Sequence, residues 1–111
     1  MPGQFNPGKA PSHTPITALA WVDSSIKIRV FWQDISRNLL TSNWNNGWSS
    51  PTKVIGPLVG TYVSAVQWNN GVSVRIYSEG SGDDVVEACT DSNESSWYTG
   101  QGVATTTIVA K

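Results

Sequence analysis

Three kinds of side chain in this sequence have the chemistry to bind a ligand: arginine, glutamate and tryptophan. Arg75 offers a rigid fork of N–H donors, and Glu87, twelve residues later, can accept hydrogen bonds from two hydroxyls at once. The chain also has six tryptophans, whose indole rings can pack against C–H groups and still donate an N–H. Taken alone, Arg75 and Glu87 are most simply explained as a cross-strand salt bridge.

The composition of the chain excludes several functions in which these side chains could take part. The chain has 111 residues and a net charge of −1, so it lacks the basic surplus that binding to nucleic acid requires. One cysteine, Cys89, and one histidine, His13, exclude an intrachain disulfide, a cysteine zinc cluster and most histidine chemistry. We expect Cys89 to be a small buried thiol, and we expect no metal ion or other cofactor.

The placing of the acidic residues disfavours an enzyme. Glycoside hydrolysis needs two carboxylates about 5–10 Å apart across a cleft. Asp83, Asp84 and Glu87 form the only acidic cluster, and they lie too near one turn to face each other. The other acids are expected in turns or at exposed positions: Asp23, Asp34, Glu79, Asp91 and Glu94. We therefore expect no catalytic residues.

The elements that must position these side chains are β-strands. Ile26–Phe31 and Val72–Tyr77 alternate with a period of two and are rich in β-branched and aromatic residues. Asn46-Gly47 and Asn70-Gly71 suit hairpin turns, because both residue types tolerate positive φ. No segment has the apolar stripe of a helix. The sequence predicts an all-β protein.

The N-terminal segment differs from the rest. Residues 1–15 contain four prolines and no long apolar run, so we expect an irregular Pro-rich arm that is neither a signal peptide nor a membrane span. Localisation stays open between the cytoplasm, with non-classical release, and the outside of the cell.

An internal repeat is the decisive feature. The motif Ala18–Trp21 recurs as Ala65–Trp68, and Ile28–Phe31 recurs as Val74–Tyr77, with the two arginines 46 residues apart. Trp48 and Trp97 are 49 apart, which indicates a small insertion near residues 92–95 in the second copy.

A period of 40–50 residues with about four short strands is typical of a propeller blade. The sequence thus predicts two blades, residues 16–61 and 62–111. Propellers close with about four to eight blades, so two blades alone would leave sheet faces exposed. Head-to-tail association that closes on itself would cover them, and three chains would give a six-bladed ring. The repeat alone leaves two or four chains open.

These motifs resemble the fucose-binding lectins of the fungal fruit-body type and of the small bacterial two-blade type. The resemblance rests on Ala-x-x-Trp, on Ile/Val-Arg-Val/Ile-aromatic, on a Glu about a dozen residues later, and on a Gly/Ser-Trp pair, and it covers residues 16–104. It implies a six-bladed β-propeller formed by a homotrimer. It further implies binding of L-fucose or fucosylated glycans, multivalent through assembly, with cell-surface glycoconjugates as partners.

The resemblance also implies where sugars bind. In the family, one blade supplies an Arg and a Glu, and the next blade supplies two aromatics. This implies one complete sugar-binding set, made of Arg75, Glu87, Trp44 and Trp48, with the aromatics donated by a neighbouring chain. It implies a degenerate second set within one chain, made of Arg29, Thr41, Thr90 and Trp97, in which Thr41 replaces the Glu and Thr90 replaces an aromatic.

Structural roles remain open for several of these residues. Trp21 and Trp68 are expected to pack within their blades, and Trp32 either in the core or at a rim or interface. Trp97 could equally be part of a site or inter-blade packing. The alternative functions are a lectin for another monosaccharide and a structural or protein-interaction propeller without sugar binding.

Overall fold

A computed structural model describes residues 8, 10, 14–58, 62–80, 84–93 and 96–100 of the chain. His13, Asp83, Glu94 and most of the expected N-terminal arm lie outside these residues. Within them the fold is all-β, as the sequence predicted, and no helix occurs in the described ranges. Accordingly, these ranges contain no helix that could cross a membrane.

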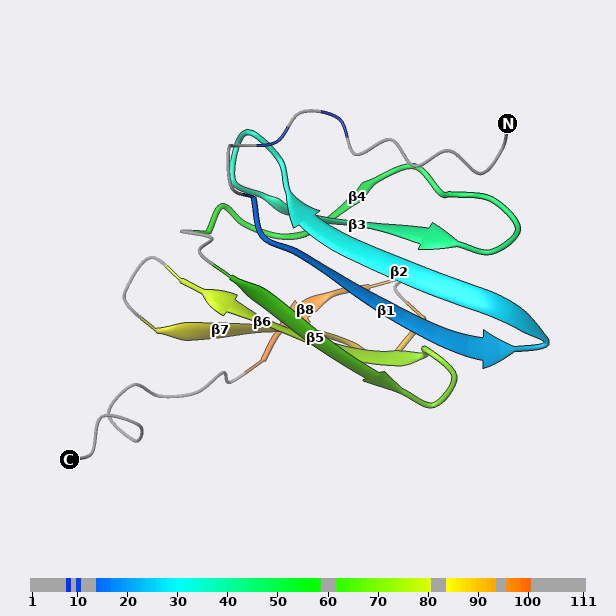
Figure 1. Ribbon diagram of the computed structural model, residues 1–111. Helices are drawn as coiled ribbons and strands as arrows, with labels where there is room; N and C mark the ends of the chain where they lie inside the picture. The colour runs from blue at the N-terminus through cyan, green and yellow to red at the C-terminus, as the bar shows by residue number, and fades with distance from the viewer. Residues whose placement is uncertain are drawn as a thin grey trace.

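The strands form two separate four-stranded antiparallel sheets (Figure 1). The first sheet has the order β1 (Ile16–Asp23), β2 (Ser25–Gln33), β3 (Leu39–Trp44) and β4 (Thr52–Ile55). The second repeats this order with β5 (Val63–Trp68), β6 (Ser73–Glu79), β7 (Val85–Thr90) and β8 (Tyr98–Thr99). Each sheet is an up-and-down meander, which is the strand order of a propeller blade.

The turns follow the local sequence. Asn46 and Gly47 connect β3 to β4 with φ of 61° and 152°, and Asn70 and Gly71 connect β5 to β6 with φ of 55° and 81°. The positive φ predicted for both Asn-Gly pairs is therefore confirmed.

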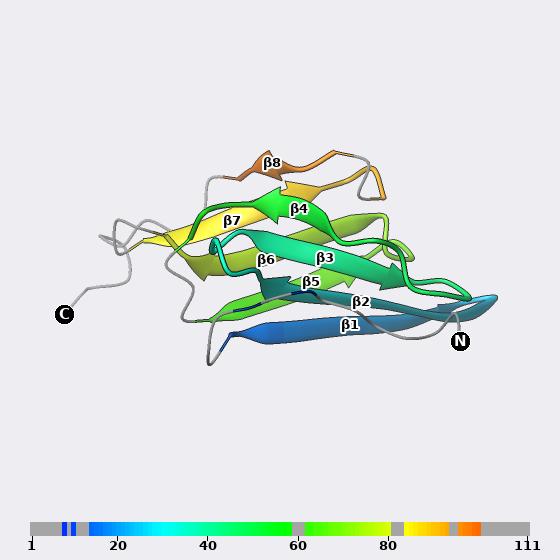
Figure 2. The same cartoon turned by 90° about the horizontal axis from the view of Figure 1, so that it is seen from above.

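The two sheets stack face to face, with the first strands β1 and β5 making the most extensive contact between them (Figures 1 and 2). Between the sheets lies the core, to which the first sheet gives Phe31 and Leu39 and the second gives Val74, Ile76 and Ala88. Parts of the outer faces of both sheets remain exposed in the single chain. Large apolar side chains project from them: Ile16, Val22, Ile26, Val66, Trp68 and Tyr98.

The tryptophans expected to pack within the blades differ from one another. Trp21 is half-buried, since Gly71 of the second sheet lies directly against its ring. Trp68, its counterpart, is 47% exposed, because it lies on the outer face of the second sheet. Trp32 is only 1% exposed, but it pairs with Ile16 and so lies on the face of the first sheet opposite Phe31, outside the core cluster between the sheets.

Candidate functional site

The strand register makes the two repeats comparable position by position. Tyr77 pairs with Glu87 across β6 and β7, and Phe31 pairs with Thr41 across β2 and β3. Thr41 therefore stands in the first sheet where Glu87 stands in the second. In the same way, Trp44 opposite Ile28 corresponds to Thr90 opposite Val74.

Arg75 lies on the outer face of the second sheet and is held by Asp91. Its Nη1 and Nη2 donate to the two carboxylate oxygens of Asp91 at 3.1 and 3.2 Å, and Nη1 also donates to the carbonyls of Val74 and Thr90. The guanidinium carbon lies 5.0 Å from the centroid of the Trp68 ring, which adds a cation–π contact. Arg75 is thus presented as a fixed fork on an aromatic surface.

Asp91 was missed in the sequence, where it was expected only as an exposed turn residue. Its side chain is 46% exposed, and it is the acid that pairs with Arg75 among the described residues, in place of the cross-strand pair with Glu87. The Tyr98 hydroxyl donates to the same carboxylate at 2.7 Å. Hydrogen bonds from Tyr98, Arg75 and Ser73 lower the pKa of Asp91 to about 2. The carboxylate is therefore ionised at neutral pH.

Glu87 lies on the same outer face, one strand away from Arg75. The Tyr77 hydroxyl donates to its Oε2 at 2.9 Å, and this bond raises the pKa of Tyr77. A Cβ at Gly100 would overlap the Glu87 carboxylate, so the glycine leaves room for it. Cys89, between Glu87 and Asp91 on this face, is buried as expected, and desolvation raises the pKa of its thiol. The face thus carries Arg75 and Glu87 beside a cluster of aromatic rings.

Trp44 and Trp48 flank the β3–β4 turn. They form a single β-bridge to one another, and their rings meet at 62° with centroids 5.6 Å apart. The Asn45 N–H donates to the Gly47 carbonyl at 3.0 Å, which closes the turn between them. Both rings are half-buried and belong to the outer face of the first sheet, because Trp44 pairs with Ile28. One chain therefore carries the two halves of the predicted sugar-binding set on different outer faces.

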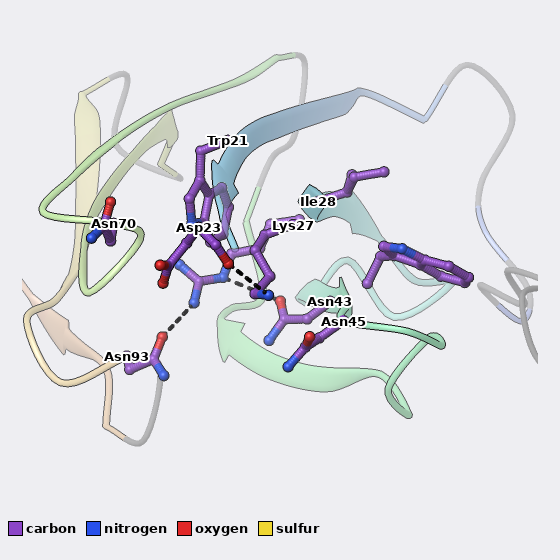
Figure 3. A pocket seen from close by; sticks show the side chains of 10 residues that line it. Trp21, Asp23, Lys27, Ile28, Asn43, Asn45, Asn70 and Asn93 are labelled. Atoms are coloured by element: carbon purple, nitrogen blue, oxygen red, sulfur yellow. Dashed lines mark hydrogen bonds between the residues drawn. The ribbon is translucent and has the colours of Figure 1, made fainter. Parts of the chain in front are cut away.

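Arg29, the counterpart of Arg75, points into the space between the sheets and is only 3% exposed. Its Nη1 donates to the Gly71 carbonyl at 2.6 Å, and its Nε donates to Asn43 Oδ1 at 3.2 Å. Its Nη2 donates to Asn93 Oδ1 at 2.8 Å, which is the dashed line that ends at Asn93 in Figure 3. Its guanidinium carbon lies 5.0 Å from the Trp21 ring centroid, the same distance as in the Arg75–Trp68 pair.

A hollow of about 150 Å³ lies beside Arg29. Its lining includes Trp21, Lys27, Asn43, Trp44, Asn45, Asn70 and Asn93 (Figure 3). The other members of the predicted degenerate set lie apart from this lining. Thr41 and Thr90 are 1% and 0% exposed, and Trp97 packs edge-on against Phe31.

The described part of the chain contains no candidate metal site. No group of three or more His, Cys, Asp or Glu side chains is gathered there in a way that could hold a metal ion.

No protein-family model matches the sequence, and no curated protein matches it. Several solved structures, however, are similar to this chain. A mutant of the Aleuria aurantia lectin in complex with Fucα1-6GlcNAc superposes with a TM-score of 0.72 and 28% identity, over 87% of this chain and 32% of the lectin. A fucose lectin from Kordia zhangzhouensis in complex with methyl-fucoside gives a TM-score of 0.65 and 25% identity, over 80% of this chain and 65% of that chain.

A mutant of AofleA from Arthrobotrys oligospora gives a TM-score of 0.69 and 26% identity, over 92% of this chain and 31% of that one. The chain thus spans about a third of the two fungal proteins and 65% of the Kordia lectin. In its β-propeller-like fold and its sequence, the chain is similar to fucose-binding lectins.

Proposed function

We propose that this protein is a non-catalytic lectin that binds L-fucose or fucosylated glycans between the blades of a six-bladed ring made by three chains. The observation that carries the proposal is the outer face of the second sheet, where Arg75, Glu87 and Trp68 are presented without a covering sheet. Two similar structures, by their names, are lectins solved with fucose-containing ligands.

The packing within one chain supplies the pattern for assembly. The face of the first sheet that bears Arg29 packs on the face of the second sheet that bears Val74 and Ile76. By the repeat, the Arg75 face of the second sheet corresponds to the Arg29 face. The outer face of the first sheet, with exposed Ile16, Val22 and Ile26, corresponds to the face with Val74 and Ile76. Placing one against the other in a second copy repeats the same contact and buries apolar surface.

The same pattern brings Trp44 and Trp48 to Arg75. Within the chain, Arg29 meets the loop that follows β7, through Asn93, and Trp97 from that connection meets Phe31. The corresponding connection in the first sheet follows β3 and holds Trp44 and Trp48. In the ring, this turn of one chain would lie over Arg75 and Tyr77 of its neighbour. The sugar-binding set would then be complete only after assembly.

The chemistry of this set suits a deoxy sugar. An indole can pack against the methyl group and the C–H patch of fucose, while its N–H meets a hydroxyl. Arg75 can donate to neighbouring ring and hydroxyl oxygens, and Glu87 can accept from two hydroxyls. Each charge-assisted hydrogen bond contributes about 1.5–3 kcal/mol. We also propose that the boundary between the two blades lies between residues 61 and 62.

The length comparison favours three chains. Because the chain spans 31–32% of two fungal proteins, three copies correspond to the length of one of them. Three sugar-binding sites in one ring would raise avidity for multivalent glycans on cell surfaces without any new contact.

Intermolecular complementation tests the proposal directly. Arg75→Ala and Trp48→Ala chains are each expected to lose binding to immobilised fucose. When they are refolded together, some neighbours pair an intact Arg75 with an intact Trp48, so a fraction of the binding should return. The matched control refolds Arg75→Ala with an Arg75→Ala/Trp48→Ala double variant, in which no complete set can form.

Three results would contradict the proposal. Light scattering of the wild type should give three times 12.0 kDa, and a stable monomer would exclude the ring. Equal binding to fucose, glucose and mannose on a glycan array would favour the alternative of a lectin for another monosaccharide. Binding to none of them would favour a structural or protein-interaction propeller.

A further inference from the structure

Arg29 and Arg75 hold equivalent positions in the two sheets, but their surroundings differ. The Arg75 side chain is 20% exposed on an outer face, and its carboxylate partner is itself exposed. Arg29 is 3% exposed, and its hydrogen bonds reach three segments of the chain. Asn43 belongs to the first sheet, whereas Gly71 and Asn93 lie in two turns of the second.

Asn93 is fixed in the position from which it meets Arg29. Its φ is 57°, and its backbone N–H donates to the Val72 carbonyl at 3.1 Å. The side-chain Oδ1 then accepts from Arg29 Nη2 at 2.8 Å, while the Gly71 carbonyl accepts from Nη1 at 2.6 Å. Two oxygens of the second sheet thus occupy the fork of the guanidinium. Asp91 holds the fork of Arg75 in a similar way, but that side chain is 20% exposed on an outer face, whereas Arg29 is enclosed between the sheets where a ligand would have to separate them.

We infer that the Arg29 site is occupied by the chain itself, so that Arg29 and Asn93 clamp the two sheets together and take no sugar. Charge-assisted hydrogen bonds of a buried guanidinium are strong, and losing one partner leaves a buried charge poorly satisfied. The clamp fixes the angle between the sheets.

The space beside Arg29 agrees with this inference. The hollow there measures about 150 Å³, and its lining includes Asn43 and Asn93, whose side-chain oxygens already accept hydrogen bonds from Arg29. Thr41 stands where a sugar-accepting Glu would be needed, and it is 1% exposed. The inference that each chain binds one sugar rather than two rests on the proposed function, whereas the clamp itself does not.

Thermal unfolding tests the clamp without any sugar. Asn93→Gly removes the acceptor and keeps the backbone, because glycine adopts positive φ readily. Its unfolding midpoint should fall by about 5 °C or more. Ser24→Gly is the matched control, since Ser24 has φ of 65° at an exposed turn and its replacement leaves every Arg29 acceptor in place. Equal midpoints for the two variants would overturn the clamp.

Calorimetric titration with methyl-fucoside tests the sugar count. The wild type and Arg29→Gln should both bind one fucoside per chain, whereas Arg75→Gln should bind none. A wild type that binds two fucosides per chain, of which Arg29→Gln loses one, would overturn the inference. A wild type that binds no fucoside contradicts the proposed function instead, and the unfolding comparison still decides whether the clamp exists.

Discussion

The indole ring of Trp97 meets the phenyl ring of Phe31 edge to face, with centroids 6.4 Å apart and planes at 90°. Phe31 belongs to the first sheet and is fully buried, whereas Trp97 precedes β8 of the second sheet. The contact therefore joins the two sheets. In the repeat, Tyr77 corresponds to Phe31 and Trp48 to Trp97, so a ring would carry a similar aromatic contact between chains.

The first prediction concerns this contact. Trp97→Ala should lower the free energy of unfolding by about 3 kcal/mol, because it removes a large aromatic side chain packed on the core. Trp97→Phe keeps an edge contact with Phe31, so it should lower the free energy of unfolding by about half as much or less. Urea unfolding followed by fluorescence measures both. If the two variants unfold at the same urea concentration, the ring contact contributes nothing specific.

Much of this fold follows from sequence patterns that have a direct physical cause. Alternation with a period of two predicted the strands around Arg29 and Arg75, and the Asn-Gly pairs predicted turns with positive φ. Counting residues along the repeat places Thr41 at the position that Glu87 has in the second copy. The strand register agrees, because Phe31 pairs with Thr41 as Tyr77 pairs with Glu87.

The partners of the two arginines could not be predicted in the same way. Asp91 follows the end of β7, and only the pairing of Arg75 with Cys89 shows that Asp91, two residues further on, shares the face of Arg75. The alternation of side chains along β7 was the one available signal. Asn93 lies in the insertion of the second repeat, where the first repeat offers no counterpart to compare. Its contact with Arg29 depends on how the sheets stack.

The second prediction concerns Gly71, which packs against Trp21. Its φ is 81°, and a Cβ there would overlap the indole ring. Gly71→Ala should therefore lower the free energy of unfolding by about 2–4 kcal/mol, through backbone strain and overpacking together. Gly8→Ala is the matched control, because Gly8 has φ of 76° and open space around its Cβ position. A similar loss in both variants would show that strain alone is responsible.

The third prediction concerns the hydrogen bond from Tyr77 to Glu87. Tyr77→Phe removes the donor that orients the carboxylate, and we expect methyl-fucoside to bind about tenfold more weakly, which corresponds to roughly 1.4 kcal/mol. Calorimetry measures the affinity. Tyr62→Phe is the control, since this exposed ring lies outside the proposed set and its hydroxyl can be removed without touching Glu87. Unchanged affinity in Tyr77→Phe would contradict the orienting role.

The last prediction concerns the pH dependence of Asp91. Its pKa in the folded chain is about 2, below the usual 3.8, so its ionised form favours folding above pH 3.8. That contribution is lost as the pH falls through about 2. The hydrogen bond from the Tyr98 hydroxyl is the largest cause of this lowered pKa. Tyr98→Phe should therefore raise the pKa of Asp91 toward 3.8, while the hydrogen bonds from Arg75 and Ser73 still keep it below that value. Carboxyl NMR titration of both proteins measures the shift, with Tyr62→Phe as the control that leaves the midpoint unchanged. An identical midpoint in the wild type and in Tyr98→Phe would show that Arg75, rather than the phenol, sets the charge of this carboxylate beside the proposed sugar-binding set.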